Sequence, residues 1–208
     1  MSRVLRVVGP AGADEVLPLY PISSGERLDS HYFIPWNFRR FSKSDFRRLA
    51  DPEVGWFGFL LFQEAYDESP PGTLPADDRL LAHALHLSLD RWQALCAREI
   101  GPLHGWYRVK CDNGETRLAH RVVTETALAA LEGKRKAEAD QEARLRAKRI
   151  KDLGQMIEGK LRAPSFTKAP GQVERFNDWL EAHHPGKLRR EPFIRAALEE
   201  FMKETNRF

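Results

Sequence analysis

The apolar residues of this chain recur at helical spacing over most of its length, and this pattern predicts a series of short helices. A helix capped by Ser42 is expected to end at Leu49, because the serine hydroxyl can accept a free backbone N–H. A second helix should open at Asp51, with Pro52 in its first turn, where a missing N–H is harmless. Residues 54–66 (VGWFGFLLFQEAY) are apolar nearly all round, so this helix is expected at the buried centre of its domain.

Two further helices are predicted next, joined through a tight turn. The first covers residues 77–87, and Ser88 is the expected N-cap of the second, which reaches about Glu99. In the second helix the apolar residues share one face, and an outer stripe carries Arg91 and Arg98. Two short helices joined through a capped turn are typical of a helix-turn-helix.

A β-hairpin is predicted after these helices. Strand-like segments 106–111 and 116–120 flank the sequence DNGE, and the Asn-Gly pair favours a two-residue type I′ turn. That turn would place Lys110 opposite Arg117, with Arg108 on the same face. Like charges directly across a strand pair cost stability, so this face is either solvated or contacts an anion such as phosphate.

The order of these elements predicts a mainly α-helical chain with a small β-hairpin, in which a winged helix-turn-helix precedes a long basic helix and a C-terminal helical hairpin. The predicted parts are an N-terminal arm (1–28) with a strand-like run (3–8), a winged-helix domain (29–133), a basic helical extension (134–162), a linker (163–171) and the helical hairpin (172–208).

Positive charge is concentrated in one of these parts. Across 208 residues, 33 Lys and Arg stand against 30 Asp and Glu, for a net charge of +3, which excludes a uniformly basic surface. Residues 134–162 contain 10 basic and 5 acidic side chains, whereas residues 29–120 contain 11 and 13. The sequence therefore predicts a basic helix attached to a slightly acidic domain.

The cysteine content and the apolar runs indicate which cellular compartment the protein occupies. Cys96 and Cys111 are too few for a disulfide framework, and they suit a reducing environment. The N-terminus lacks the pattern of a signal peptide, and the longest apolar-rich window, residues 54–62, is far shorter than a membrane span. We expect a soluble cytoplasmic protein, associated with the nucleoid if it binds DNA.

Ordered features between residue 32 and about residue 135 resemble the YdaU-like family of phage and prophage proteins. The first three are an aromatic stretch with proline (FIPW), a short helix ending in Leu-Ala-Asp (RRLADPE) and a helix with glycine and aromatics (GWFGFLLFQEAY). They are followed by Leu-Pro-x-Asp-Asp before the next helix (LPADDRLLAHAL) and a Ser-x-x-x-Trp turn (SLDRW). The last is a short hairpin that leads into a charged helix (HRVVTETALAALEGKRKAEAD). The resemblance implies a winged-helix DNA-binding module with a role in replication initiation or helicase recruitment. The longer N-terminal arm, the entry HYFIPWNFRRF and the C-terminal helical hairpin depart from the family pattern.

Catalysis has no support in the motifs of this chain. It contains no phosphate-cradling glycine motif, no Gly-x-Ser-x-Gly and no paired zinc-ligand spacing, so we expect neither an enzyme nor a bound cofactor. His83 and His86 share a predicted helix face but lack a third ligand at a fitting spacing, and no metal site is predicted there. A site built from Cys96, Cys111 and His120 is the alternative.

The predicted function is binding to double-stranded DNA, in replication initiation or transcriptional control, in a phage-derived or bacterial setting. The helix opened by Ser88 would enter the major groove, the hairpin would hold the backbone, and the basic extension would add electrostatic affinity. The residues predicted to contact DNA are Arg91, Gln93, Arg98, Arg108, Lys110, Asn113, Arg117, Lys134, Arg135, Lys136, Arg144, Arg146, Lys148 and Arg149.

Other interpretations fit the same segments. The basic helix, which also contains Lys151, could be solvated and held by salt bridges such as Glu142 to Arg146, or it could form a homodimer, although its apolar seam is thin. The winged helix could be a protein–protein adaptor that recruits a helicase or replisome, which the −2 charge of residues 29–120 favours. The C-terminal helical hairpin is expected to bind a replication or transcription protein.

Overall fold

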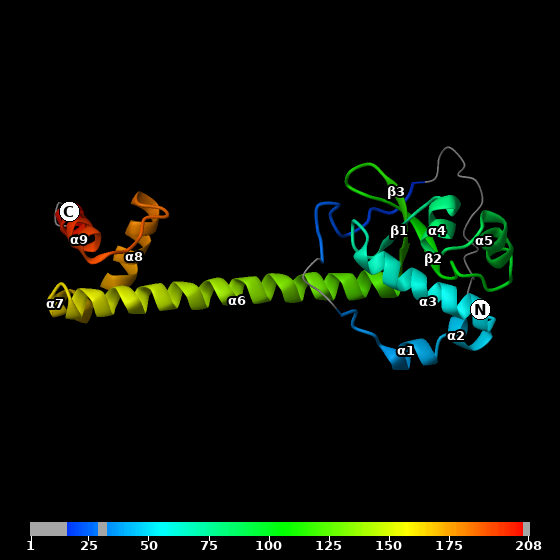
Figure 1. The fold of residues 1–208 in the computed structure, drawn as a ribbon, viewed down its shortest axis with the longest axis horizontal. Helices are drawn as coiled ribbons and strands as arrows, with labels where there is room; N and C mark the ends of the chain where they lie inside the picture. Colours follow the sequence, from blue (N-terminus) through cyan, green and yellow to red (C-terminus); the bar gives the residue numbers. More distant parts are fainter. Residues whose placement is uncertain (1–15, 29–32, 206–208) are drawn as a thin grey trace. The chain divides into compact units, whose positions relative to one another are not determined.

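A computed structural model describes residues 16–28 and 33–205 and shows two compact units, Met1–Lys134 and Arg135–Phe208. The described chain is mainly helical and contains a three-stranded antiparallel sheet in the first unit (Figure 1). The strand-like run predicted at residues 3–8 lies outside the described residues. None of the helices in the described ranges is long and apolar enough to cross a membrane.

Along the chain, the first unit contains three helices, a strand, two helices, two strands and the beginning of a long helix. They are α1 (Phe38–Ser42), α2 (Asp45–Leu49), α3 (Pro52–Asp67), β1 (Thr73–Pro75), α4 (Asp78–Ala84), α5 (Leu89–Cys96), β2 (Trp106–Lys110), β3 (Thr116–His120) and the beginning of α6 (Arg121–Gly159).

The helix predicted to start at Ser42 is two short helices in the structure. Asn37 caps α1 by accepting the N–H of Arg40, and the Ser44 hydroxyl caps α2 by accepting the N–H of Arg47 at 3.2 Å. The prediction that Ser42 is the cap is therefore wrong by two residues. Both serines have the chemistry of a cap, and the extended backbone of Ser44 places it at the start of α2.

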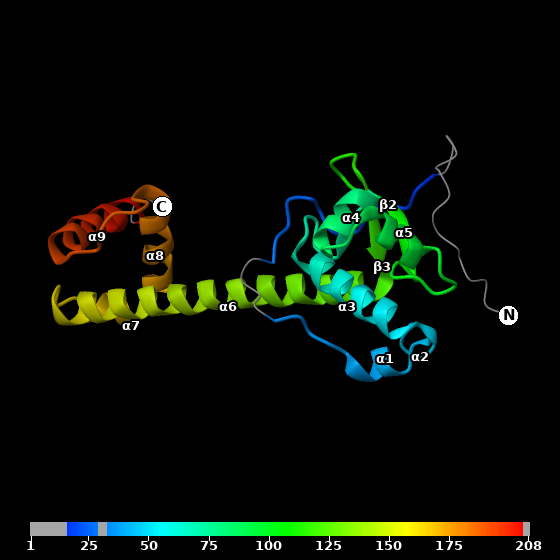
Figure 2. The ribbon, with the colours of Figure 1, turned by 45° about the vertical axis from the view of Figure 1, so that its right-hand side comes forward.

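Helix α3 begins at Pro52, as predicted, and it is buried on one face only. Val54, Gly58 and Leu61 lie in the core, whereas Trp56 is 57% exposed, so the expectation of a wholly buried helix is wrong. The outer face is covered in part by α1 and α2, which lie on the side of α3 away from the strands (Figure 2). These helices are too short to cover all of it.

Helices α4 and α5 pack against each other after capped starts. The Ser88 hydroxyl accepts the N–H of Arg91 at 3.3 Å, which confirms Ser88 as the N-cap of α5. Trp92, fully buried, donates from its indole nitrogen to Asp78 at the start of α4, at 3.0 Å. Helix α5 ends at Cys96, about three residues earlier than predicted.

The hairpin is present, but its predicted register is wrong by one residue. Val109 lies opposite Arg117, and Lys110 lies opposite Thr116. The reason is the turn: Gly114 has a φ of +86°, Asn113 does not have a positive φ, and the Cys111 N–H donates to the Glu115 carbonyl at 2.9 Å. This is the three-residue connection with glycine in the left-handed position, not a type I′ turn. The predicted repulsion between Lys110 and Arg117 across the strands is therefore absent.

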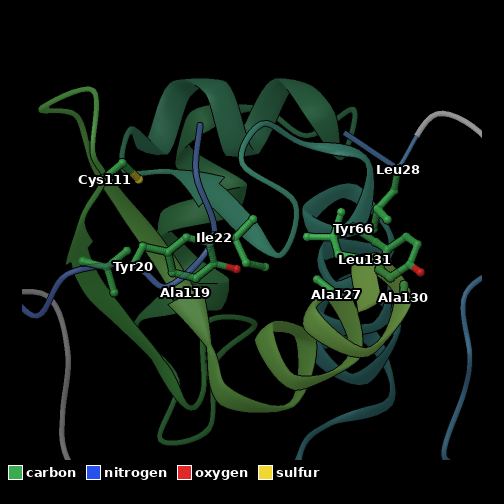
Figure 3. Close-up of a cluster of buried hydrophobic side chains, with 10 residues drawn as sticks. Tyr20, Ile22, Leu28, Tyr66, Cys111, Ala119, Ala127, Ala130 and Leu131 are labelled. Carbon is green, nitrogen blue, oxygen red and sulfur yellow. The ribbon is translucent and has the colours of Figure 1, made fainter. Parts of the chain in front are cut away.

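The sheet has the order β1-β3-β2, and residues of the N-terminal arm cover its outer edge. The Tyr20 N–H donates to the Lys110 carbonyl, and the Lys110 N–H donates to the Pro18 carbonyl, each at 2.9 Å. Tyr20 and Ile22 pack beside Ala119 of β3, in a cluster that also holds Tyr66 of α3 and side chains of α6 (Figure 3). Tyr20, Ile22 and Leu28 of the arm thus belong to the core of the first unit.

The second unit is built from the end of α6, α7 (Pro164–Lys168), α8 (Gln172–His183) and α9 (Glu191–Thr205). Ile157, Phe176 and Ile194 are fully buried and join three of these helices in one core. Helix α7 lies within the segment predicted as a linker, and buried Phe166 anchors it. The apolar stripes predicted for the last two helices thus pack on each other and on α6.

Candidate nucleic-acid interface

Helix α5 is the element predicted to enter the major groove, and its basic side chains are already paired. The Arg91 guanidinium contacts both carboxylate oxygens of Glu53, at 2.5 Å each. This partner holds the pKa of the Glu53 carboxyl below its usual range. Arg98 contacts Asp51 at 2.9 Å and Glu53 at 3.2 Å. Gln93 is exposed and uncharged, so α5 offers little free positive charge.

Arg117, one of the two hairpin arginines predicted to touch phosphate, is largely buried and paired with a carboxylate. The side chain of Arg117 is 12% exposed, donates to the Thr73 hydroxyl at 2.7 Å and forms an ion pair with Glu68. Arg108 is half-buried, and its Nε has no hydrogen-bond partner in the described structure. Of the basic residues on the two strands, Lys110 alone is fully exposed.

The tip of the hairpin carries negative charge. Asp112 accepts from the Ser23 hydroxyl at 2.6 Å and from the Ser24 N–H at 3.0 Å, and these hydrogen bonds lower its pKa to about 2. Asn113 accepts the N–H of Glu115, whose carboxylate is the second acidic group of the tip. A phosphate approaching this tip would meet two carboxylates, so the hairpin is poorly suited to hold a DNA backbone.

Helix α6 separates its basic residues into two faces. On one face, Arg146 contacts both oxygens of Asp178 at 2.7 and 2.8 Å, and Arg149 contacts Glu181 at 3.2 Å. Both partners lie on α8, so these arginines join α6 to α8 at the surface of the second unit. The predicted i,i+4 pair of Glu142 with Arg146 gives way to this contact with Asp178.

The opposite face of α6 holds basic side chains that point into solvent. At 100° per residue, Arg144, Lys148 and Lys151 fall within roughly 60° of one another and opposite Arg146 and Arg149, and Lys136 lies at one edge of this group, beside the acidic Asp140. All are exposed, and none forms an ion pair with a described residue. We call this set the α6 stripe; its members are Lys136, Arg144, Lys148 and Lys151.

The two remaining predicted contacts of α6 differ from the stripe. Lys134 donates to the Arg27 carbonyl at 3.0 Å and so ties α6 to the N-terminal arm within the first unit. Arg135 is exposed, and it has an interaction of its own. The structure thus brings Lys136, Arg144 and Lys148 of the predicted set together with Lys151.

A second group of exposed basic residues was not predicted as a site. Residues 39–48 contain five basic side chains and one acidic one, and of the five only Arg40 forms an ion pair with a described residue, to Glu125 at 2.6 Å. We call the others the α1–α2 cluster: Arg39, Lys43, Arg47 and Arg48, all exposed. Acidic residues elsewhere in the range 29–120 cancel this local excess of positive charge, which is visible only over about ten residues.

A cavity of about 820 Å³ lies behind α1 and α2 in the first unit. Its wall combines aromatic side chains, among them Trp36 and Phe62, with the Arg40–Glu125 ion pair. His120 lines it too, and burial, with the nearby positive charges, lowers its pKa to about 4, so the ring is neutral at pH 7. The Tyr66 hydroxyl has no hydrogen-bond partner in the described structure.

Within the described residues, no group of three or more His, Cys, Asp and Glu side chains is placed to hold a metal ion. Cys96 and Cys111 are both free thiols, and burial raises the pKa of Cys96 to about 12. A thiol in this state is a poor nucleophile and a poor metal ligand at neutral pH.

Comparisons with known proteins add no relative: no family model, no curated protein and no solved structure matches this chain.

Proposed function

We propose that this chain is a double-stranded DNA-binding protein in which the α6 stripe makes the main contact with the phosphate backbone. The observation that carries the proposal is the division of α6 into an ion-paired face and a free basic face. Four exposed cations on α6 without an ion-pair partner among the described residues are free to contact phosphates, and such contacts would release counterions.

The first unit supports this proposal through its arrangement. The order α3-β1-α4-α5-β2-β3 with the sheet order β1-β3-β2 is the one expected of a winged helix-turn-helix, the fold implied by the resemblance to YdaU-like proteins. That resemblance also favours a role in replication initiation over transcriptional control. The paired Arg91 and Arg98 favour binding with little sequence preference, because side chains that hold Glu53 are not free to contact base edges.

The test is binding of the full chain to random-sequence duplex DNA by fluorescence anisotropy over a range of salt. The stripe variant carries Lys136→Gln, Arg144→Gln, Lys148→Gln and Lys151→Gln. Each phosphate that the variant leaves without a cation should reduce the steepness of log K against log salt by about 0.9, and affinity at low salt should fall at least about tenfold.

A matched control removes the same charge from other exposed positions of the second unit. It carries Lys160→Gln, Lys168→Gln, Arg190→Gln and Lys203→Gln. Its affinity should stay within about threefold of wild type, since net charge alone has a small effect beyond the Debye length. Equal losses in both variants would overturn the stripe as the interface, and no wild-type binding at low salt would overturn the DNA proposal.

The adaptor function remains the second candidate, and one observation favours it. The first unit has 16 basic and 18 acidic residues, and the arginines of α5 and β3 are engaged with carboxylates. Such a surface suits a protein partner better than DNA. Failure of the wild type to bind duplex DNA would leave this function as the better account of the first unit.

A further inference from the structure

The first unit exposes large aromatic side chains near its shortest helices. Phe33 is 85% exposed, Phe38 is 62%, Trp56 is 57% and Trp36 is 39%. Monomeric proteins rarely leave neighbouring apolar side chains in water unless the surface binds something.

Three aromatic rings form a continuous row across α3. Trp36 meets Phe59 edge to face, with ring centroids 4.9 Å apart, and Phe59 stacks on Trp56 at 6.1 Å. The row runs beside α1, because Trp36 also packs on Phe41 at 5.0 Å. We call Trp36, Phe59 and Trp56 the aromatic row. The rings at its two ends, Trp36 and Trp56, are exposed to solvent.

The α1–α2 cluster begins close to this row in the chain, because Phe38 and Arg39 follow Trp36 by two and three residues. The Arg39 guanidinium lies over the Phe38 ring, 5.8 Å from its centroid, so a cation and an exposed ring occupy one site. The acidic residues at the nearby start of α3, Asp51 and Glu53, are bound to Arg98 and Arg91. Residues 39–48 therefore keep most of their local charge of +4 free.

We propose that the aromatic row and the α1–α2 cluster together bind single-stranded nucleic acid. Unpaired bases stack on exposed rings, and arginine and lysine side chains beside the rings contact the phosphates that connect those bases. A duplex cannot use the row, because its bases are stacked inside the helix. This site lies in the first unit and is separate from the α6 stripe, so it holds or fails independently of duplex binding.

The experiment compares two labelled probes on the full chain: an oligothymidine of about 15 nucleotides and a duplex of the same length. An aromatic variant, Phe38→Ala with Trp56→Ala, removes the exposed ring beneath Arg39 and one exposed ring of the row without changing charge. A cluster variant replaces Arg39, Lys43, Arg47 and Arg48 by Gln. The control variant, Leu80→Ala with Leu188→Ala, removes two exposed apolar side chains elsewhere. Circular dichroism checks that each variant folds.

The aromatic variant should bind oligothymidine at least about tenfold more weakly, with duplex affinity unchanged within about twofold. The cluster variant should weaken oligothymidine binding and flatten its salt dependence by about 0.7 for each phosphate that no longer meets a cation. The control variant should match wild type.

Three results would overturn the proposal. One is a wild type that does not bind oligothymidine at low salt. Another is an aromatic variant whose affinity for oligothymidine equals that of wild type, which would show that charge alone accounts for the binding. The third is sedimentation showing that Trp56→Ala dissociates an oligomer while oligothymidine affinity stays the same, which would make the row a self-association surface.

Discussion

At the scale of single residues, the role of each cation depends on its partner. Arg117 and Lys110 are both basic residues of the hairpin and were predicted to act alike. The structure buries one against Glu68 and Thr73 and exposes the other. A charged side chain that is buried and paired mainly affects folding, whereas a solvated one is free to bind an anion.

Arg117→Gln should therefore lower stability without lowering duplex affinity. We expect a loss of about 1–3 kcal/mol in the free energy of unfolding, less than for a fully buried pair because Glu68 is partly exposed. Lys110→Gln should stay within about 0.5 kcal/mol. Urea denaturation followed by tryptophan fluorescence measures both. Equal losses in the two variants would show that the pair with Glu68 contributes nothing.

His120 should make the first unit sensitive to mild acid. Its pKa is about 4 in the folded chain, below the ordinary value of 6.5, because burial disfavours the charged ring. The unfolded chain therefore binds more protons between these values. Stability is full above pH 6.5 and falls as the pH drops to 4, by up to about 3 kcal/mol.

The ring also accepts the Val122 N–H at the start of α6, through Nδ1 at 3.3 Å, a contact that protonation removes. Asparagine can accept the same N–H but does not titrate. Urea midpoints at pH 7 and at pH 4.5 should therefore differ less in His120→Asn than in wild type. An identical pH dependence in the two chains would assign the acid sensitivity to other groups.

At the scale of elements, local chemistry predicted where most helices and strands begin, and it failed where two local solutions compete. The start of α3 at Pro52 and the capping of α5 by Ser88 follow from such local chemistry. The sequence DNGE fits both a two-residue and a three-residue turn. Hydrogen bonds from Ser23 and Ser24 to Asp112 accompany the second, and these residues are 88 or more positions away in the chain. The hairpin register, and with it the environment of Arg117, could not be read from the local sequence.

Residues 135–145 of α6 are all exposed and precede the contacts with α8, so this stretch of helix depends mainly on helix propensity. Gly133 lies just before it, and an added Cβ there has no atom within 4 Å. Gly133→Ala should stabilise this part of α6 by about 0.5–1 kcal/mol, because alanine loses less backbone entropy than glycine. Amide hydrogen exchange around residue 133 should slow by about two- to fivefold. Gly133→Pro, as the opposite control, should speed it, and faster exchange in the alanine variant would contradict a helix at this position.

At the scale of the whole molecule, charge is divided between the two units. Residues Met1–Lys134 carry a net charge of −2, and Arg135–Phe208 carry +5. The sequence predicted this excess in the basic extension, and the free stripe is part of it. It could not predict which cations of α6 stay free, because the partners of Arg146 and Arg149 are on α8, some 30 residues later.

This division predicts how duplex binding depends on salt and on sequence. With four phosphate contacts from the α6 stripe, affinity should fall roughly a hundredfold between about 50 and 200 mM salt. Two duplexes of equal length and unrelated sequence should bind with affinities within about threefold, because Glu53 and Asp51 hold Arg91 of α5 and Arg98 just after it. Anisotropy titrations with both duplexes give these values. Selection from a random duplex library that enriches one motif, bound more than about tenfold better than the rest, would show that α5 releases its carboxylate partners and reads bases.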